Sequence, residues 1–483
     1  MPAGTEASGD EEARWWGEHL VGQVLLRVRD AAPYLPVLET LADRGAYGPW
    51  FWTALRVGAH DRFALLRRLV VHDPSPGDGH RYLDTVAELL AADPAGAQRQ
   101  LTAWFDDERA LPALPDATVA TAAQALLHTH RHRAVDDLTE ALVDCPHPRA
   151  DELLTVLADE EPSALCRAVD RWAHDERTDR HVAALAYGLR VQSRARGDAD
   201  HGLLRYAALA LLARPGGDRL HGAALALLVR DPRSRPAYLD RALRRFATGD
   251  PQLPASALAA ALESDPDPVL AAFRTRLGEL GPGAGDIVRT LADVTTPALA
   301  RRAAALVGEV TADRPEGAAR HAAAFVDRCL ERGPTGRSVL LPLALELLRA
   351  PSTAVRAALA PVLAAPGTAA SRGLRGELLD VLLGQERDPD VLAAVLDAAA
   401  RGAVRRGQAR TRDLVHRTGT LLVRTPQGAA RFDRGLVELA GAVPGFAALT
   451  ARWLAAEPDD WAALVGPSTR RTVESVAGAA VPV

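Results

Sequence analysis

Short apolar stretches that end in proline, glycine or aspartate recur along the whole sequence. Within each stretch, apolar residues return at intervals of three and four positions over about ten to eighteen residues, which is the periodicity of an amphipathic α-helix. Residues 265–269 (Asp-Pro-Asp-Pro-Val) open one such stretch, and residues 388–391 (Asp-Pro-Asp-Val) open another. Aspartate caps free amides at a helix start, and proline fits the first helical turn. The pattern predicts a series of helices separated by turns.

Residue usage supports an all-α fold. Alanine, leucine and valine supply most of the apolar residues, Ile287 is the only isoleucine, and aromatic residues make up 5% of the chain. Alanine and leucine lose little side-chain entropy in a helix, whereas β-branched and aromatic residues favour sheets. Because 483 residues exceed what one hydrophobic core usually organises, we expect several domains or an elongated array of repeats.

Four of the helix starts share a common pattern. They lie at residues 265–273, 296–304, 351–359 and 388–396, and the third contains Val355-Arg356. These segments resemble the helix start of the HEAT repeat, Asp-Pro-x-x-Val-Arg-x-x-Ala, and the resemblance is best over residues 265–401. The armadillo repeat is the alternative. The resemblance implies a right-handed superhelical α-solenoid of about a dozen antiparallel helix pairs, whose stacked neighbours form a concave groove.

The two ends of the sequence differ from its middle. Half of the aromatic residues precede residue 110, and Trp453 and Trp461 lie near the other end. Terminal repeats must close an exposed core end, so we expect capping regions over residues 1–110 and 441–483 and the repeat array over residues 111–440. Tryptophan also anchors protein interfaces, so Trp50 and Trp52 are alternative partner-binding residues.

The sequence contains no lysine, so its 57 basic residues are all arginine. This usage is typical of a GC-rich, actinobacterial genome, and it excludes a Walker-A lysine, a kinase lysine and a Schiff-base nucleophile. Residues 333–338 (Gly-Pro-Thr-Gly-Arg-Ser) resemble the tail of a phosphate-binding loop but follow a predicted helix rather than a strand, so we expect a turn. We find no catalytic motif and therefore expect no enzyme and no cofactor.

Histidine and cysteine give no metal site. His128 and His132 would share one face of a continuous helix, and His174 and His181 form a second candidate pair, but neither pair has a convincing third ligand. We therefore expect solvated polar faces and no bound metal. The three cysteines have no paired spacing, which suits a reducing compartment; they are Cys145, Cys166 and Cys329.

The N-terminal twelve residues are small, polar and acidic, without the basic and apolar parts of a signal peptide. No uncharged apolar stretch is long enough to cross a bilayer, so we expect a cytoplasmic protein without membrane contact. The sequence leaves its oligomeric state open.

The polar feature that most suggests a binding site is a run of arginines in which Asp413 and Asp433 are the only acidic residues. Its members are Arg401, Arg405, Arg406, Arg410, Arg412, Arg417, Arg424, Arg431 and Arg434. On one continuous helix, Arg405 and Arg412 would lie near one face, and Arg406, Arg410 and Arg417 near the adjacent one. Such a stripe could bind acidic groups through bidentate contacts, unless acidic residues of neighbouring repeats neutralise it.

We expect a non-enzymatic scaffold or adaptor that presents its groove to a protein or peptide partner. One alternative is a nucleic-acid-binding HEAT-like protein of the DNA-glycosylase type that uses the arginine stripe. The net charge of −5 and the lack of aromatic residues between Arg401 and Phe432 disfavour it. The other alternative is an enzyme that resembles the phycobilin-lyase-type HEAT proteins, or an accessory regulator of a neighbouring NTPase or protease system.

Overall fold

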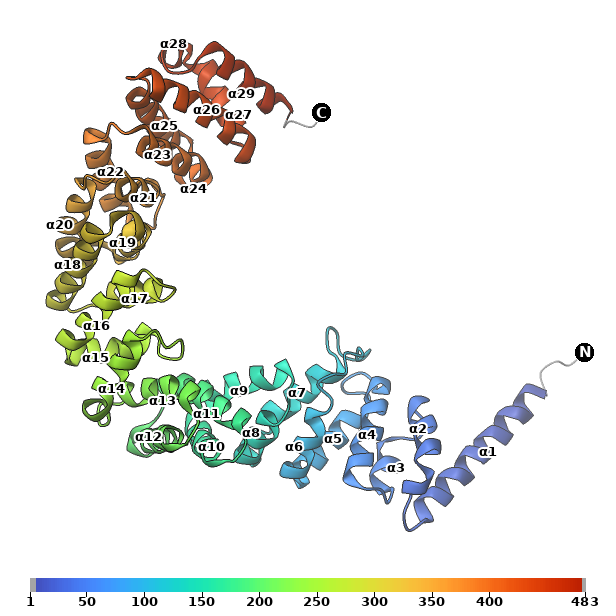
Figure 1. The fold of residues 1–483 in the computed structure, drawn as a ribbon. Helices are drawn as coiled ribbons and strands as arrows, with labels where there is room; N and C mark the ends of the chain where they lie inside the picture. Colours follow the sequence, from blue (N-terminus) through green and yellow to red (C-terminus); the bar gives the residue numbers. More distant parts are fainter. Residues whose placement is uncertain (1–5, 480–483) are drawn as a thin grey trace, which may run out of the picture. The chain divides into compact units, whose positions relative to one another are not determined.

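The structure, a computed structural model, describes residues 6–479, with side chains for residues 16–333 and 336–478. Of the sequence features above, the acidic residues 1–12, Trp15, Pro334 and Thr335 lie outside the described side chains. Over residues 6–479 the chain forms 29 α-helices, five short 3₁₀ helices and no β-strand (Figure 1). The prediction of an all-α solenoid is therefore confirmed.

The chain divides into two compact units, residues 1–227 and residues 228–483. The described helices of the first unit are α1 (Glu6–Arg27), η1 (Ala32–Tyr34), α2 (Leu35–Asp43), α3 (Pro49–Ala54), α4 (Ala59–Leu69), η2 (Val70–His72), α5 (Tyr82–Ala92), α6 (Pro94–Thr102), α7 (Val119–Thr129), η3 (Arg131–Arg133), α8 (Val135–Val143), α9 (Pro148–Glu160), α10 (Pro162–His174), α11 (Thr178–Val191) and α12 (Gly197–Ala213). Helix α13 (Asp218–Arg230) contains the boundary.

The second unit continues the same arrangement. Its helices are α14 (Arg235–Ala247), η4 (Ala255–Leu258), α15 (Ala259–Ser264), α16 (Pro266–Glu279), α17 (Ala284–Ala292), α18 (Pro297–Asp313), α19 (Pro315–Glu331), η5 (Gly333–Gly336), α20 (Arg337–Leu348), α21 (Thr353–Ala364), α22 (Arg372–Gln385), α23 (Pro389–Arg401), α24 (Ala403–Arg406), α25 (Gln408–Leu422), α26 (Pro426–Ala442), α27 (Phe446–Ala456), α28 (Pro458–Ala462) and α29 (Pro467–Ala479).

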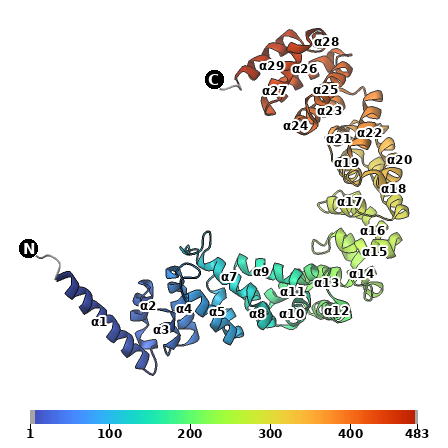
Figure 2. The same ribbon diagram turned by 180° about the vertical axis from the view of Figure 1, so that it is seen from behind.

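Each unit consists of helices that contact both their chain neighbours and the helices two places away, as the two opposite views show (Figures 1 and 2). In the first unit, α2, α4, α6, α8, α10 and α12 form one continuous layer. In the second unit, α14, α16, α18, α20 and α22 form one layer, and α17, α19, α21 and α23 form the other. Stacking of this kind buries the apolar face that no single helix pair can bury alone.

The helix starts predicted from the sequence agree with the structure. Helices α16, α18 and α23 begin at Pro266, Pro297 and Pro389, and the Asp388 carboxylate accepts a hydrogen bond from the amide of Asp390. The segment at residues 333–338 consists of the 3₁₀ turn η5 and the first two residues of α20, so it follows a helix, as predicted, and not a strand. Proline therefore lies in the first turn of α16, α18 and α23, and an aspartate side chain caps one of them.

Small residues let successive repeats approach closely. A methyl group added at Gly188 of α11 would lie 3.2 Å from Leu227 Cδ1, and one added at Gly308 of α18 would lie 3.2 Å from Leu343 Cδ1. At Gly419 of α25 the ring of Phe432 lies so close that an added methyl group would sit 2.6 Å from Cζ. Larger residues at these seams would separate the stacked helices and create voids.

Arginine–carboxylate pairs connect one repeat to the next. Arg328 of α19 donates to both oxygens of Asp293 after α17, at 2.6 and 2.8 Å, across 35 positions of sequence. Arg167 of α10 binds Asp136 of α8 in the same bidentate way, across 31 positions. Exposed pairs contribute little stability individually, but their fixed planar geometry specifies how neighbouring repeats align.

Candidate functional site

The predicted arginine stripe is interrupted. Gly407 has a φ of 87° and separates the one-turn helix α24 from α25. Arg405 and Arg406 therefore lie on α24, whereas Arg410, Arg412 and Arg417 lie on α25. The prediction of shared faces on one continuous helix is wrong, because it did not include the left-handed glycine that ends α24.

Acidic residues neutralise much of the stripe. Arg412 pairs with Glu457, and Arg417 pairs with Asp380 at 2.7 Å. Two further pairs are Arg401–Asp397 at 2.8 Å and Arg431–Asp390 at 3.2 Å. Three of these four partners belong to a different helix from their arginine, which is the arrangement that ion pairs take elsewhere in the solenoid. These arginines are therefore not available as a free anion-binding stripe.

Arg406 has a structural role. Its guanidinium donates to the carbonyl oxygens of Ala399, at 2.9 Å, and of Ala364 in the preceding repeat. Burial lowers the pKa of Arg406. These bonds hold α24 against α21 and α23, so Arg406 anchors the turn and does not face a partner.

The anchored turn presents Val404, Arg405 and Arg410 to solvent. Val404 is 90% exposed, the highest value among the exposed large apolar side chains of the described residues. Arg405 and Arg410 are exposed and form no ion pair with any described side chain. We call residues 402–410 the α24 turn. The sequence analysis did not predict that Val404 would be exposed beside Arg405 and Arg410. A valine between Gly402 and Gly407 is a signal that could have identified this exposed turn.

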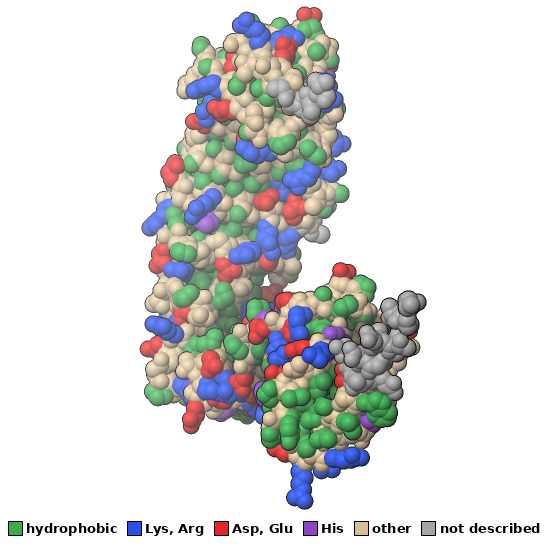
Figure 3. All heavy atoms as spheres, turned by 90° about the vertical axis from the view of Figure 1, so that its right-hand side faces the viewer, with side chains coloured by type: hydrophobic (Ala, Val, Ile, Leu, Met, Phe, Trp, Pro, Cys, Tyr) green, Lys and Arg blue, Asp and Glu red, His purple; other side chains and the backbone are tan. Residues whose placement is uncertain are grey.

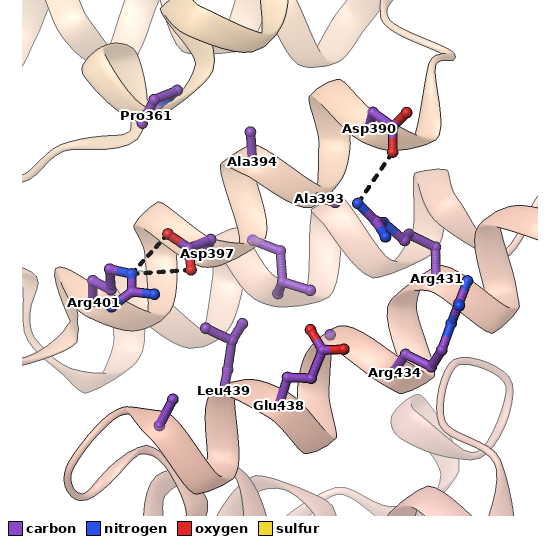
Figure 4. A pocket seen from close by; sticks show the side chains of 13 residues that line it. Pro361, Asp390, Ala393, Ala394, Asp397, Arg401, Arg431, Arg434, Glu438 and Leu439 are labelled. Carbon is purple, nitrogen blue, oxygen red and sulfur yellow. Dashed lines mark hydrogen bonds and ion pairs between the residues drawn. The ribbon is translucent and has the colours of Figure 1, made fainter.

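A groove of about 570 Å³ lies between α23 and α26, directly before the α24 turn in the chain (Figure 4). Its apolar lining includes Leu396 and Leu439, and Pro361 of α21 contributes an edge. Figure 4 shows Arg401 joined to Asp397 on one side and Arg431 joined to Asp390 on the other. We call this space the α23–α26 groove.

Positive and negative side chains balance in this groove. Three arginines and three carboxylates line it. Two of each form the ion pairs named above, and the remaining arginine and carboxylate are Arg434 and Glu438 of α26. Arg434 donates to the carbonyl oxygen of Ala430 at 3.3 Å and forms no ion pair within the described residues, and neither does Glu438. One cation and one anion are therefore available for a ligand. That combination suits a polypeptide, which carries both donors and acceptors, better than a polyanion.

The two tryptophans predicted as partner contacts have different environments. Trp52 is 1% exposed, and its indole nitrogen donates to the carbonyl of Ala46 at 3.1 Å. Its prediction as a binding residue is wrong, because it fills the core of the first repeat beside Phe51. Trp50, two positions earlier, is 68% exposed.

The histidine pairs take part in polar contacts. Helix α7 ends at Thr129 and a 3₁₀ turn follows, so His128 and His132 do not share the face of one helix. His128 contacts Glu160 at 2.8 Å, and His132 contacts Glu161 at 3.0 Å. Within the described side chains, no cluster of three potential ligands could hold a metal ion.

The second candidate pair and the cysteines show similar structural roles. His181 is buried, with its Nε2 2.7 Å from the carbonyl oxygen of Asp175, while His174 contacts the carbonyl of Asp170. Burial raises the pKa of the Cys166 thiol to about 12 and that of Cys329 to about 11. Both thiols are therefore protonated at neutral pH and are poor nucleophiles.

Two other hollows are weaker candidates. A space of about 450 Å³ in the first unit is lined by Arg67 and Arg109, but both guanidiniums bind Asp107. A space of about 770 Å³ at the ends of α18 and α20 is mostly apolar, with Pro342 and Leu345 in its wall. Its lining includes Glu346 and Arg349 but lacks an exposed turn like α24 next to it in the chain, so we take the α23–α26 groove with the α24 turn as the candidate site.

No family model matches this chain, and no curated protein matches it. Among solved structures, the chain is similar to the karyopherin Kap121p bound to the extreme C-terminus of the protein phosphatase Cdc14p, at 14% sequence identity and a TM-score of 0.27. The match covers 88% of this chain and 47% of the karyopherin, so the chain spans about half of that protein's length. None of the helices in the described residues is long and apolar enough to cross a membrane.

Proposed function

We propose that this protein is a non-enzymatic scaffold that binds a polypeptide segment along the α23–α26 groove and over the α24 turn. The observation that carries the proposal is the α24 turn itself. Arg406 fixes its backbone, while Val404, Arg405 and Arg410 stay exposed directly after α23, whose last residue, Arg401, lines the groove. Val404 lies on a fixed backbone next to two guanidiniums that no carboxylate binds. The turn therefore loses little backbone entropy when a partner binds.

The chemistry of the partner follows from the charges. At the α24 turn, Arg405 and Arg410 favour carboxylates placed next to an apolar side chain that covers Val404. Inside the groove, Arg434 and Glu438 favour a segment with both signs of charge. We therefore propose a mixed-charge polypeptide that is acidic where it meets the α24 turn. Regulation of a neighbouring NTPase or protease would be one use of such a binding site.

Recognition of nucleic acid is the weaker alternative. Four of the nine arginines from Arg401 to Arg434 form ion pairs, and Arg406 binds carbonyl groups. Phe432, the one aromatic residue among them in the sequence, is fully buried and offers no face for stacking on a base. We expect no salt-dependent retention of the protein on single-stranded or duplex DNA.

A peptide-display selection tests the proposal. The full chain is used as bait, in parallel with the double variant Arg405→Glu/Arg410→Glu and with the control Arg372→Glu. Arg372 is an exposed arginine on α22 outside the site, with no ion pair among the described residues. We expect sequences with acidic and apolar residues to be enriched on the wild type and on the control but not on the double variant. No enrichment on any bait, or equal enrichment on all three, would overturn the proposal.

A further inference from the structure

Large apolar side chains are unusually exposed at the N-terminal end of the first unit. Of the eleven large apolar residues that are exposed among the described side chains, seven precede residue 51. They are Trp16, Leu20, Val21, Val24, Tyr34, Val37 and Trp50. Figure 3, which faces this end, shows apolar side chains gathered beside the grey residues on the first unit. Concentration of this kind marks an interaction surface more often than chance exposure does.

Helix α1 is held on its other side by defined contacts. The hydroxyl of Tyr47 donates to the carbonyl oxygen of Glu18, and the Tyr47 ring lies so close to Gly22 that an added methyl group would sit 2.9 Å from it. Leu25 is buried on the same side. One turn apart on the free side, Leu20 is 60% exposed and Val24 is 58% exposed. The face of α1 that carries Leu20 and Val24 is therefore exposed because α1 packs through its opposite face.

The packing of α1 does not use Leu20 and Val24. Helices α1 and α3 contact each other, with Leu25 of α1 and Phe51 and Trp52 of α3 buried. Leu20 and Val24 stay exposed, so they are available for binding.

Three arginines lie at the C-terminal end of α1. Arg27, Arg29 and Arg56 are exposed and form no ion pair with any described side chain. The carbonyl of Arg56 accepts a hydrogen bond from Ala31 at 2.9 Å, which brings Arg56 close to the C-terminal end of α1. Asp30 is the exposed carboxylate beside them, so arginines outnumber carboxylates at this end of the helix.

We infer that this face binds an amphipathic helix of a partner protein, with its apolar side on Leu20 and Val24 and with acidic residues against Arg27, Arg29 and Arg56. We call this set of five residues the α1 surface. Residues one turn apart form a ridge that fits the groove of a second helix. Charge complementarity selects an acidic helix over a basic one. The site is separate from the α24 turn, so it does not depend on the function proposed above.

Fluorescence anisotropy with two synthetic peptides tests the inference on the full chain. Each peptide is an amphipathic helix of about 18 residues, or five turns, with leucine on one face and either glutamate or lysine on the other. We expect the glutamate peptide to bind and the lysine peptide to bind at least about tenfold more weakly. Leu20→Glu/Val24→Glu should reduce binding of the glutamate peptide about tenfold or more, and Arg27→Glu/Arg29→Glu should reduce it several-fold.

Val182→Glu is the matched control, because Val182 is an exposed valine on α11, outside the α1 surface. We expect it to bind the glutamate peptide as the wild type does. Circular dichroism establishes that each variant is folded. As a second measurement that needs no variant, amide exchange of residues 16–27 should slow when the glutamate peptide is added.

Three results would overturn the inference. The first is absence of binding, or equal binding of the two peptides. The second is a dimer of the wild type, seen by light scattering, that Leu20→Glu/Val24→Glu dissociates, because the occupant would then be a second copy. The third is sedimentation with phosphatidylserine vesicles that the same double variant abolishes, because the occupant would then be a lipid surface.

Discussion

Arg375 gives the sharpest test of how charge holds this solenoid together. It lies on α22 and is 3% exposed. Its Nη2 donates to Asp327 and to Glu331 of α19, at 2.6 Å each, and its Nε donates to Ser371 at 3.2 Å. It also donates to the carbonyl of Val362 in α21. One buried guanidinium therefore connects α19, α21 and α22.

The effect of replacing Arg375 by methionine can be worked from these contacts. Burial alone would raise the pKa of Glu331, but hydrogen bonds from Thr368, Arg375 and Ser371 outweigh it and hold the pKa at about 2. Methionine fills similar space but removes the donor to Asp327 and to the Val362 carbonyl, and leaves Glu331 with Thr368 and Ser371 alone. Breaking a buried ion pair costs about 3 to 5 kcal/mol. Since both carboxylates are partly exposed and can rehydrate, we expect a loss of about 2 to 3 kcal/mol.

Urea unfolding followed by circular dichroism measures this loss, and amide exchange locates it. Because the stability of a solenoid is approximately a sum over neighbouring repeats, exchange should accelerate first in α19, α21 and α22. Arg372→Met, three positions earlier on the same helix and exposed, is the control and should stay within about 0.5 kcal/mol of the wild type. If Arg375→Met is no more destabilised than Arg372→Met, the reasoning is refuted.

Three other predictions concern single groups. Burial alone would raise the pKa of Asp107, but hydrogen bonds from arginines lower it from 3.8 to about 2, so its stabilising effect should be lost as the pH falls through that interval. Thermal unfolding across this range should show a smaller pH dependence in Asp107→Asn; an unchanged slope would contradict the prediction. Cys166 and Cys329 should resist iodoacetamide at about pH 8 until the protein is denatured, as mass spectrometry would show. Gly367→Ala should lower stability measurably in urea, because φ is 58° there and the added methyl group would lie 2.4 Å from Ser371 Oγ; an unfolding midpoint equal to that of the wild type would argue against strain at this turn.

Much of the fold could be predicted because its signals are local. The starts of α16, α18 and α23 depend on an aspartate or threonine followed by proline, and these residues act within one helical turn. Polar and glycine-rich segments are less informative: residues 191–200 have the composition of an exposed loop, yet α12 begins within them, at Gly197. Helix boundaries near glycine are harder to predict, since glycine permits several conformations.

The candidate site was harder to predict because its contacts are long-range. Arg417 pairs with Asp380, 37 positions away, and Arg412 pairs with Glu457, 45 positions away. The rotation of one repeat against the next determines which arginine forms an ion pair with which carboxylate. No local sequence pattern indicates that rotation. The burial of Trp52 and the exposure of Trp50 likewise follow from the seating of α3 on its neighbours. The sequence could therefore locate the arginine-rich region without separating its free members from its paired ones.

In this chain without lysine, some arginines connect neighbouring repeats and others remain free to bind a partner. The geometry of the repeats determines which role an arginine has. An arginine acts as a structural connector where a neighbouring repeat places a carboxylate opposite it, as Asp293 does for Arg328. That geometry is interrupted at the α24 turn, where Gly407 breaks the helix, and at α1, where no earlier helix among those described stacks against it. Exposed apolar side chains accompany the available arginines in both places, Val404 in one and Leu20 in the other. Interruptions of the repeat are therefore where this solenoid should bind its partners, and the charge-reversal variants at the α24 turn and the α1 surface test the two places independently.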